Sequence, residues 1–265
     1  MPFDNVRIHG DSGPPVLLLP GGAEACDGFF PGLPEGLATA PGCRVIVHDR
    51  PGTGDSATDG SLADAASHLN SLIDHVGLGP VVVVGQSLGG AVAVLLARDH
   101  PENVAGLVLL DPTPINDPTI CARLERTMRK FATLASIPVL RGLLSALMRA
   151  AVKRNMRRLR LRPDCAAALD RTLGLSVPKL ARAVVGITEL SAGFRETDLP
   201  QLPAVVVTAD RKPDNAIRRA HARLAAAFGA PVVSWPGATH SVHLDHPDET
   251  LATVRDLVAH RQAAP

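Results

Sequence analysis

Residues 81–90 of this chain read VVVVGQSLGG, and this stretch decides the fold. The four valines predict a short strand buried on both faces, as in a parallel sheet, and the apolar run Ala91–Ala97 predicts a helix soon after it. The chain must bend sharply between them, and Gly85 and Gly89 leave room for the bend because they lack a Cβ atom. Ser87 lies between the two glycines, so the pattern G-x-S-x-G predicts an exposed nucleophile at the carboxyl end of the sheet.

Short β-branched runs alternate with helical patterns on both sides of this stretch. Strands are predicted at Val6–His9, Val16–Leu19, Arg44–His48, Val81–Val84, Gly106–Leu110, Ala204–Val207 and Pro231–Trp235. Helices are predicted at Ser61–Val76, Ala91–Asp99, Asp214–Phe228 and Pro247–His260. This alternation is typical of an α/β fold, with a doubly wound, mostly parallel sheet that carries helices on both faces.

The alternation stops between residues 113 and 202, where no β-branched run appears. The clearest periodic segment there places apolar residues on one helix face: Leu140, Leu143, Leu144, Leu147, Met148 and Ala151. We therefore expect an all-helical insertion of about four helices.

The chain resembles the α/β-hydrolase superfamily over nearly its whole length. Three features make this resemblance. They are the bend between strand and helix at Ser87 (the elbow), the loop Asp49–Ser56 (D-x-x-G-x-G-x-S), and the segment Gly237–His240 ahead of a proline-started helix. The resemblance implies an α/β-hydrolase core of residues 1–112 and 203–265. It also implies that residues 113–202 form a helical lid inserted after the sixth strand.

The resemblance further implies an oxyanion hole and a base. Residues 20–22 read Pro-Gly-Gly where the superfamily usually carries His-Gly and then the oxyanion-binding residue. That donor is a backbone N–H, so we expect the N–H groups of Gly22 and Leu88 to bind the oxyanion. A helix N-terminus at Leu88 would add its positive end. The base should follow the last strand, which points to His240, whereas His243 and His246 are expected to be surface or packing residues.

The acid that orients the base is ambiguous. The superfamily most often places it after the strand that precedes the last one, in a pattern like G-x-x-D, but here Lys212 occupies that position, and a lysine would repel an imidazolium. Asp210 lies two residues earlier and is one candidate. Asp111, at the end of the strand Gly106–Leu110, is the other and is favoured, although Asp-Pro is also a common turn former. Asp214 is disfavoured.

These residues predict a serine hydrolase that acts on a carboxylic ester or related acyl substrate through a Ser-His-Asp triad and an acyl-enzyme. Alternatives with the same triad are hydrolysis of a C–C bond, a lactone or a thioester, and cofactor-free perhydrolysis or haloperoxidation. A non-catalytic ligand-binding protein of the same fold is a further alternative. Nothing in the pattern calls for a metal or a nucleotide cofactor.

The amino-acid composition of the chain limits the kinds of partner that we expect it to bind. A net charge of +1 gives no reason to expect nucleic acid, and four scattered cysteines suggest reduced thiols in a cytoplasmic protein. The apolar stretch Val81–Ala97 is broken by the elbow glycines, so no membrane span is expected. Between Arg123 and Arg162 twelve basic residues accompany one acid, Glu125. This suggests a solvated helix face, with steering of an anionic substrate and contact with a membrane surface or nucleic acid as the less favoured alternatives. Few aromatic residues favour an aliphatic small-molecule substrate.

Overall fold

The computed structural model describes residues 3, 5–137, 146, 150, 161–172 and 177–263. Its centre is a seven-stranded sheet with the order β1-β3-β2-β4-β5-β6-β7. The strands are β1 (Arg7–His9), β2 (Pro15–Leu19), β3 (Arg44–Val47), β4 (Val81–Gln86), β5 (Val104–Leu110), β6 (Ala204–Val207) and β7 (Val232–Val233). Only β1 pairs antiparallel, with β3, and every other neighbouring pair is parallel. The carboxyl ends of β2 to β7 therefore meet at one edge of the sheet.

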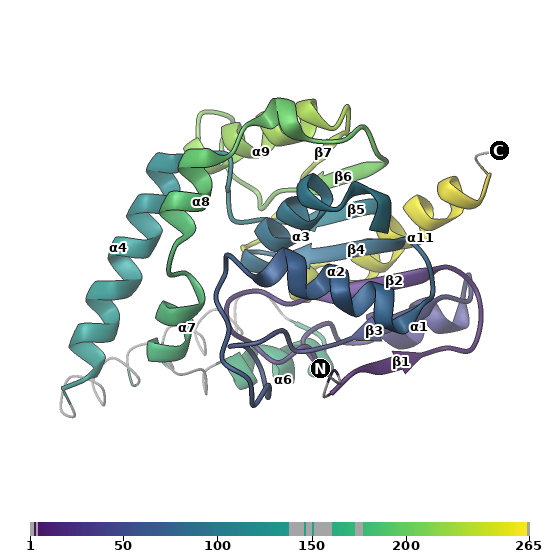
Figure 1. The fold of residues 1–265 in the computed structure, drawn as a ribbon, viewed down its shortest axis with the longest axis horizontal. Coiled ribbons are helices and arrows are strands. Elements are labelled where there is room, and N and C mark those ends of the chain that lie inside the picture. The colour runs from purple at the N-terminus through teal and green to yellow at the C-terminus, as the bar shows by residue number, and fades with distance from the viewer. Residues whose placement is uncertain are drawn as a thin grey trace.

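Helices cover both faces of this sheet (Figure 1). One face packs against α2 (Ala65–Val76), α3 (Leu88–Asp99) and α9 (Ala216–Ala227), and the other against α1 (Leu33–Thr39) and α11 (Pro247–Ala263). The short elements η1 (Pro101–Asn103), η2 (Glu196–Asp198) and α10 (Val242–Asp245) connect them. The expected doubly wound α/β fold is confirmed.

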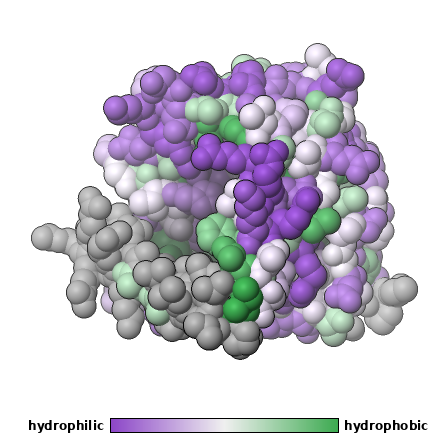
Figure 2. Space-filling model, turned by 90° about the vertical axis from the view of Figure 1, so that its left-hand side faces the viewer, coloured by the Kyte–Doolittle hydropathy of each residue, from purple (hydrophilic) through white to green (hydrophobic). Residues whose placement is uncertain are grey.

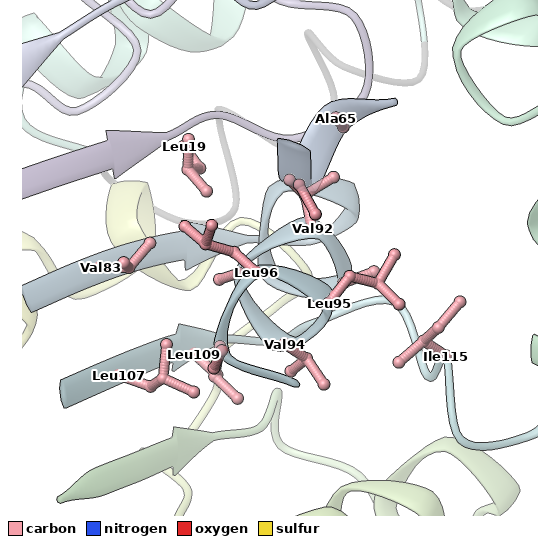
Figure 3. Packing of buried hydrophobic residues seen from close by; sticks show 14 of the residues in the cluster. Leu19, Ala65, Val83, Val92, Val94, Leu95, Leu96, Leu107, Leu109 and Ile115 are labelled. Carbon is pink, nitrogen blue, oxygen red and sulfur yellow. The ribbon is translucent and has the colours of Figure 1, made fainter. Parts of the chain in front are cut away.

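Alternating side chains of the strands divide the core into two layers. Val83, Leu107 and Leu109 face α2 and α3, whereas their neighbours Val82, Val84 and Val108 face α1 and α11. This follows from the pleat, because successive side chains point to opposite faces. Figure 3 shows the first layer, in which side chains of α3 lie against those of the central strands. Strands buried on both faces explain why the sequence reads as unbroken apolar runs.

Two features of the fold differ in detail between the sequence-based prediction and the structure. The helix expected from Ser61 begins at Ala65, because Ser61 and Asp64 bond each other in a turn ahead of it (Oγ to Oδ2, 2.6 Å). The insertion follows β5, which is the fifth strand along the chain and not the sixth. The number six came from the superfamily's strand count, and the described residues hold one strand fewer before this point.

The described part of residues 113–202 contains helices and no strand. These helices are α4 (Pro118–Ala135), α6 (Pro163–Thr172), α7 (Val177–Ala183) and α8 (Ile187–Gly193). Glu125, the one acid of the basic stretch, is buried and accepts hydrogen bonds from the N–H groups of Gly186 (3.3 Å) and Thr188 (3.1 Å). It thereby ties α4 to the start of α8. The helix predicted from Leu140 to Ala151 lies almost wholly outside the described residues.

The outer surface of the insertion is mixed. Figure 2, which faces α4, shows mostly hydrophilic residues, with apolar ones gathered near the lower edge. Phe131, Leu134 and Ile137, at the end of α4 and just beyond it, and Val185, between α7 and α8, are the exposed large apolar residues in the described part of the insertion. Of the twelve basic residues, the five described ones (Arg123, Arg126, Arg129, Lys130 and Arg162) are all exposed, and the other seven lie outside the described residues.

None of the helices within the described ranges combines the length and the apolar character that a membrane span requires. All four cysteines are buried and unpaired. Burial raises the pKa of the Cys26 thiol to about 12, so this side chain stays protonated and packs as a small apolar group.

Candidate active site

Ser87 occupies a strained bend between β4 and α3. Its backbone has φ 51° and ψ −117°, a conformation that costs a non-glycine residue about 1–3 kcal/mol and persists only where the surroundings enforce it. The Ser87 N–H donates to the carbonyl of Leu110 (3.1 Å), and its carbonyl accepts from the N–H of Thr113 (2.8 Å). At Gly89 a Cβ atom would lie 2.2 Å from the Leu19 carbonyl oxygen, so only glycine allows α3 to approach β2.

His240 lies on the loop after β7 and reaches Ser87 from the far end of the chain. Its Nε2 is 2.8 Å from Ser87 Oγ, and its Nδ1 is 2.6 Å from Asp111 Oδ2. Gln86 Nε2 donates to the His240 carbonyl (2.8 Å) and so anchors the loop to the residue before the bend. The imidazole thus has one nitrogen toward a hydroxyl and the other toward a carboxylate, which is the arrangement a general base requires.

Asp111 stands at the end of β5 with only 1% of its surface exposed. It also has a positive φ, 45°, and its Oδ1 accepts the N–H of Ala209 (2.9 Å). The guanidinium of Arg211 binds both carboxylate oxygens. Burial alone would raise the pKa of Asp111, but the hydrogen bonds from Arg211 and His240 outweigh it and hold the pKa well below its usual range. The buried carboxylate is therefore ionised at neutral pH.

Asp210 is placed elsewhere. It is exposed, and its Oδ2 accepts the N–H of Gly237 at 2.9 Å, which holds the loop after β7 against the loop after β6. Lys212 is exposed as well. The structure therefore brings Ser87, His240 and Asp111 into one hydrogen-bonded chain and leaves Asp210 outside it.

The two predicted oxyanion donors lie beside Ser87. Gly22 and Leu88 both line the cavity into which Ser87 opens, and neither N–H donates to another described residue. At Gly21 a Cβ atom would lie 2.1 Å from Gln86 Oε1 and 3.0 Å from Ser87 Cβ, so glycine is required for this close approach. Gly22 has φ 57°, and its carbonyl accepts from Arg50 Nη2 (3.2 Å). The turn can present free N–H groups to a negatively charged oxygen.

The cavity has a volume of about 420 Å³. Part of its lining is apolar and comes from α4, α6, α7 and the residue after α7, with the side chains Ile120, Leu124, Met128, Leu169, Leu180 and Val184. The charged groups among its described lining are Glu24, Asp111 and Arg211, and the last two bind each other. A neutral or aliphatic ligand portion would fit this wall without leaving a buried charge unpaired.

Sequence reasoning missed two residues of this site. Gln86 stands inside the G-x-S-x-G motif and Arg211 directly follows Asp210, but neither is assigned a role in the site from the sequence alone. The signal for Arg211 was the pair of basic residues Arg211-Lys212 at the position where the superfamily usually has its acid. A cation there would find a partner if the acid came from a neighbouring strand end.

His243 lies one turn beyond His240, on α10, and is a packing residue. It is 4% exposed, lines the cavity and stacks on Phe29 with ring centroids 4.6 Å apart. Burial first, and then the nearby His240, lowers the pKa of His243 to about 3. His246 lies farther out and contacts Glu249 (3.3 Å).

The lowered pKa of His243 predicts acid-sensitive folding. The unfolded histidine takes up a proton near its ordinary pKa of 6.5, whereas the folded one stays neutral down to about pH 3. Its contribution to stability is thus full above about pH 6.5. It falls as the pH drops toward 3, by at most about 1.4 kcal/mol per pH unit. Urea unfolding midpoints of His243→Phe should fall less steeply below pH 6 than those of the wild type. The exposed His260→Gln should match the wild type, and an equal slope for His243→Phe would contradict the prediction.

Within the described ranges no cluster of His, Cys, Asp or Glu side chains is arranged to hold a metal ion.

Comparison with known proteins places this geometry in a family. The model of the Alpha/beta hydrolase family matches residues 16–253. Lipase LipV of Mycobacterium tuberculosis is 40% identical over 110 residues, which is 41% of this chain and 41% of that protein. The sn-1-specific diacylglycerol lipase ABHD11 of Mus musculus is 32% identical over 117 residues, 43% of this chain and 38% of that protein. The match thus spans well under half of these relatives' length.

A solved structure is similar over a longer range. A thermophilic esterase from Thermogutta terrifontis matches 97% of this chain and 93% of its own, with a TM-score of 0.73 and 24% sequence identity. At this identity the likeness concerns the fold. The family match itself spans β2, the elbow at Ser87, the helical insertion, the His240 loop and the start of α11. The chain therefore belongs to the alpha/beta hydrolase family.

Proposed function

We propose that this protein is a serine hydrolase of carboxylic esters, with Ser87 as nucleophile, His240 as general base and acid, and Asp111 as the orienting carboxylate. The observation that carries the proposal is the continuous chain of contacts from Ser87 Oγ through His240 to Asp111 Oδ2. A serine hydroxyl barely ionises at neutral pH, so a base within hydrogen-bond reach is the feature that separates a nucleophile from an ordinary serine.

The reaction follows from the positions of these groups. Ser87 Oγ attacks the ester carbonyl carbon while its proton passes to His240 Nε2, and the Asp111 carboxylate stabilises the imidazolium. The N–H groups of Gly22 and Leu88 receive the negative oxygen of the tetrahedral intermediate, and each such donor contributes about 2.7–4 kcal/mol in enzymes where one was removed. His240 then protonates the departing alcohol. A water molecule, deprotonated by His240, attacks the acyl-enzyme carbonyl, and collapse of the second intermediate returns the proton to Ser87 Oγ and releases the acid.

The cavity supports an aliphatic acyl group of modest size. Its volume of about 420 Å³ lies toward the low end for small-molecule sites, which run from about 300 to 1,000 Å³. The charged side chains of its described lining are Glu24 and the mutually paired Asp111 and Arg211, so an anionic acyl group would find no unpaired cation there. The five described basic residues of the stretch Arg123–Arg162 do not line the cavity, so they would act on an anionic substrate only by steering it. Two curated relatives, both named lipases, are consistent with an ester substrate.

The test is an ester panel combined with an active-site probe. The p-nitrophenyl esters of acetate, butyrate, octanoate and palmitate are compared by kcat/KM, alongside a thioester, a lactone and a hemisuccinate ester. We expect a maximum at butyrate or octanoate, because the cavity wall is apolar but short. We also expect a fluorophosphonate to label the wild type and not Ser87→Ala. An absence of labelling would leave a non-catalytic ligand-binding role, and a preference for the thioester or lactone would move the substrate class within the same chemistry.

A further inference from the structure

Resting on the proposed function, we propose that Arg211 is a positioning residue of the triad: it holds the Asp111 carboxylate in line with His240, and its charge lets the base work at lower pH. In this chain the loop after β6 brings a cation to the triad, and the acid comes from the end of β5.

The contacts of Asp111 leave little freedom to its carboxylate. Oδ1 accepts from the Ala209 N–H (2.9 Å) and from Arg211 Nη1, while Oδ2 accepts from His240 Nδ1 (2.6 Å) and from Arg211 Nη2 (2.6 Å). A planar guanidinium bound to both oxygens fixes the plane of the carboxylate, which a single point contact cannot do. That plane decides which lone pair meets His240.

Arg211 is itself held by a buried network. Its Nη1 contacts Thr208 Oγ1 (3.4 Å), and Thr208 Oγ1 lies 2.9 Å from Nδ1 of the fully buried His221. The other ring nitrogen of His221, Nε2, is 2.7 Å from the carbonyl of Pro112, which can only accept. Nε2 therefore carries the proton, Nδ1 accepts from the Thr208 hydroxyl, and the hydroxyl oxygen is left to accept from Arg211. Each group has one consistent role, and His221 is neutral because burial lowers its pKa.

The charge of Arg211 acts on His240 through the shared carboxylate. Among the described residues, the charged and titratable groups that contact this imidazole, act on it or share its cavity are Asp111, Arg211, Glu24, and the buried rings of His221 and His243. Burial lowers the pKa values of both of these rings. Arg211 is thus the one cation in that set at neutral pH. It opposes the protonated form of His240, and a base must be unprotonated to accept the serine proton. Removing the charge should therefore shift the acidic limb of the activity profile to higher pH.

The experiment follows the pH dependence of fluorophosphonate labelling of Ser87 and of kcat on p-nitrophenyl butyrate. The variants are Arg211→Gln, which removes the charge, and Arg211→Lys, which keeps the charge but cannot bind both carboxylate oxygens through a planar guanidinium. Lys212→Gln is the matched control, because it removes an exposed cation from the same loop. We expect Arg211→Gln to lower kcat 10- to 100-fold with little change in KM, and to move the acidic limb up by about one pH unit. Arg211→Lys should lower kcat with the limb near its wild-type position, and Lys212→Gln should change neither.

Two results would contradict the proposed role of Arg211. A folded Arg211→Gln enzyme with an unmoved limb and kcat within twofold of the wild type would overturn the inference. If Arg211→Gln does not fold, Arg211→Lys provides the test. A wild-type kcat in Arg211→Lys would overturn the inference, because it would show that the two-point contact of the guanidinium with Asp111 is not needed. Failure of the proposed function is seen separately, because the wild type would then not be labelled at Ser87 at all.

Discussion

Ser87→Ala is expected to lower kcat by about 10⁶-fold, the scale measured when the nucleophile of a serine protease is removed. The oxyanion donors and the cavity remain in the variant, so a residual rate above that of water should persist. The measurement is hydrolysis of the best ester of the panel under saturating conditions, with circular dichroism to establish that the variant is folded. Ser71→Ala, an exposed serine on α2, is the matched control and should retain full activity.

The same position links catalysis to stability. Ser87 has φ 51°, which glycine adopts without the penalty that a side chain incurs. Ser87→Gly should therefore be inactive and as stable as the wild type or more so. An active Ser87→Ala enzyme, or one that still reacts with the fluorophosphonate, would remove this serine from the mechanism.

Asp111→Asn is expected to lower kcat by about 10⁴-fold, and Asp210→Asn by less than tenfold. Asparagine can occupy the site of Asp111, but it cannot both accept from His240 Nδ1 and offset the imidazolium charge, and the comparable change in a well-studied triad has this magnitude. Among the described residues the Asp210 side chain accepts a hydrogen bond from the Gly237 N–H alone, and it makes none with His240. Both variants are compared at the pH optimum of the wild type with the same ester.

Stability has to be measured beside activity, because Asp111→Asn leaves the charge of Arg211 without its buried partner. Loss of one member of a buried ion pair costs about 3–5 kcal/mol when the other stays buried, and less where the remaining group reaches water. Arg211 has a side chain that is 18% exposed, so we expect a folded but less stable variant. A loss of activity in Asp210→Asn as large as that in Asp111→Asn would transfer the role of the acid to Asp210.

Much of the fold was predictable because its signals are local. The valine run of β4, the glycines of the elbow and the apolar face of α2 each act within one element and its immediate neighbours. The parallel sheet followed from strand–helix alternation, since parallel neighbours need a crossover connection. The strand count before the insertion was wrong by one, because it was taken from the superfamily's pattern.

The sequence by itself marked the bend that presents Ser87, since Gly85 and Gly89 lack the Cβ atoms that would collide with neighbouring backbone there. It also marked His240 as the histidine on the loop after the last strand. Only the tertiary structure decided which aspartate stands beside that histidine and that Arg211 binds it. The physical reason is that the loops after β5, β6 and β7 are far apart along the chain and meet only when parallel strands align their carboxyl ends. Their side-chain contacts, and with them the charge balance of the site, depend on that assembly and on no single segment.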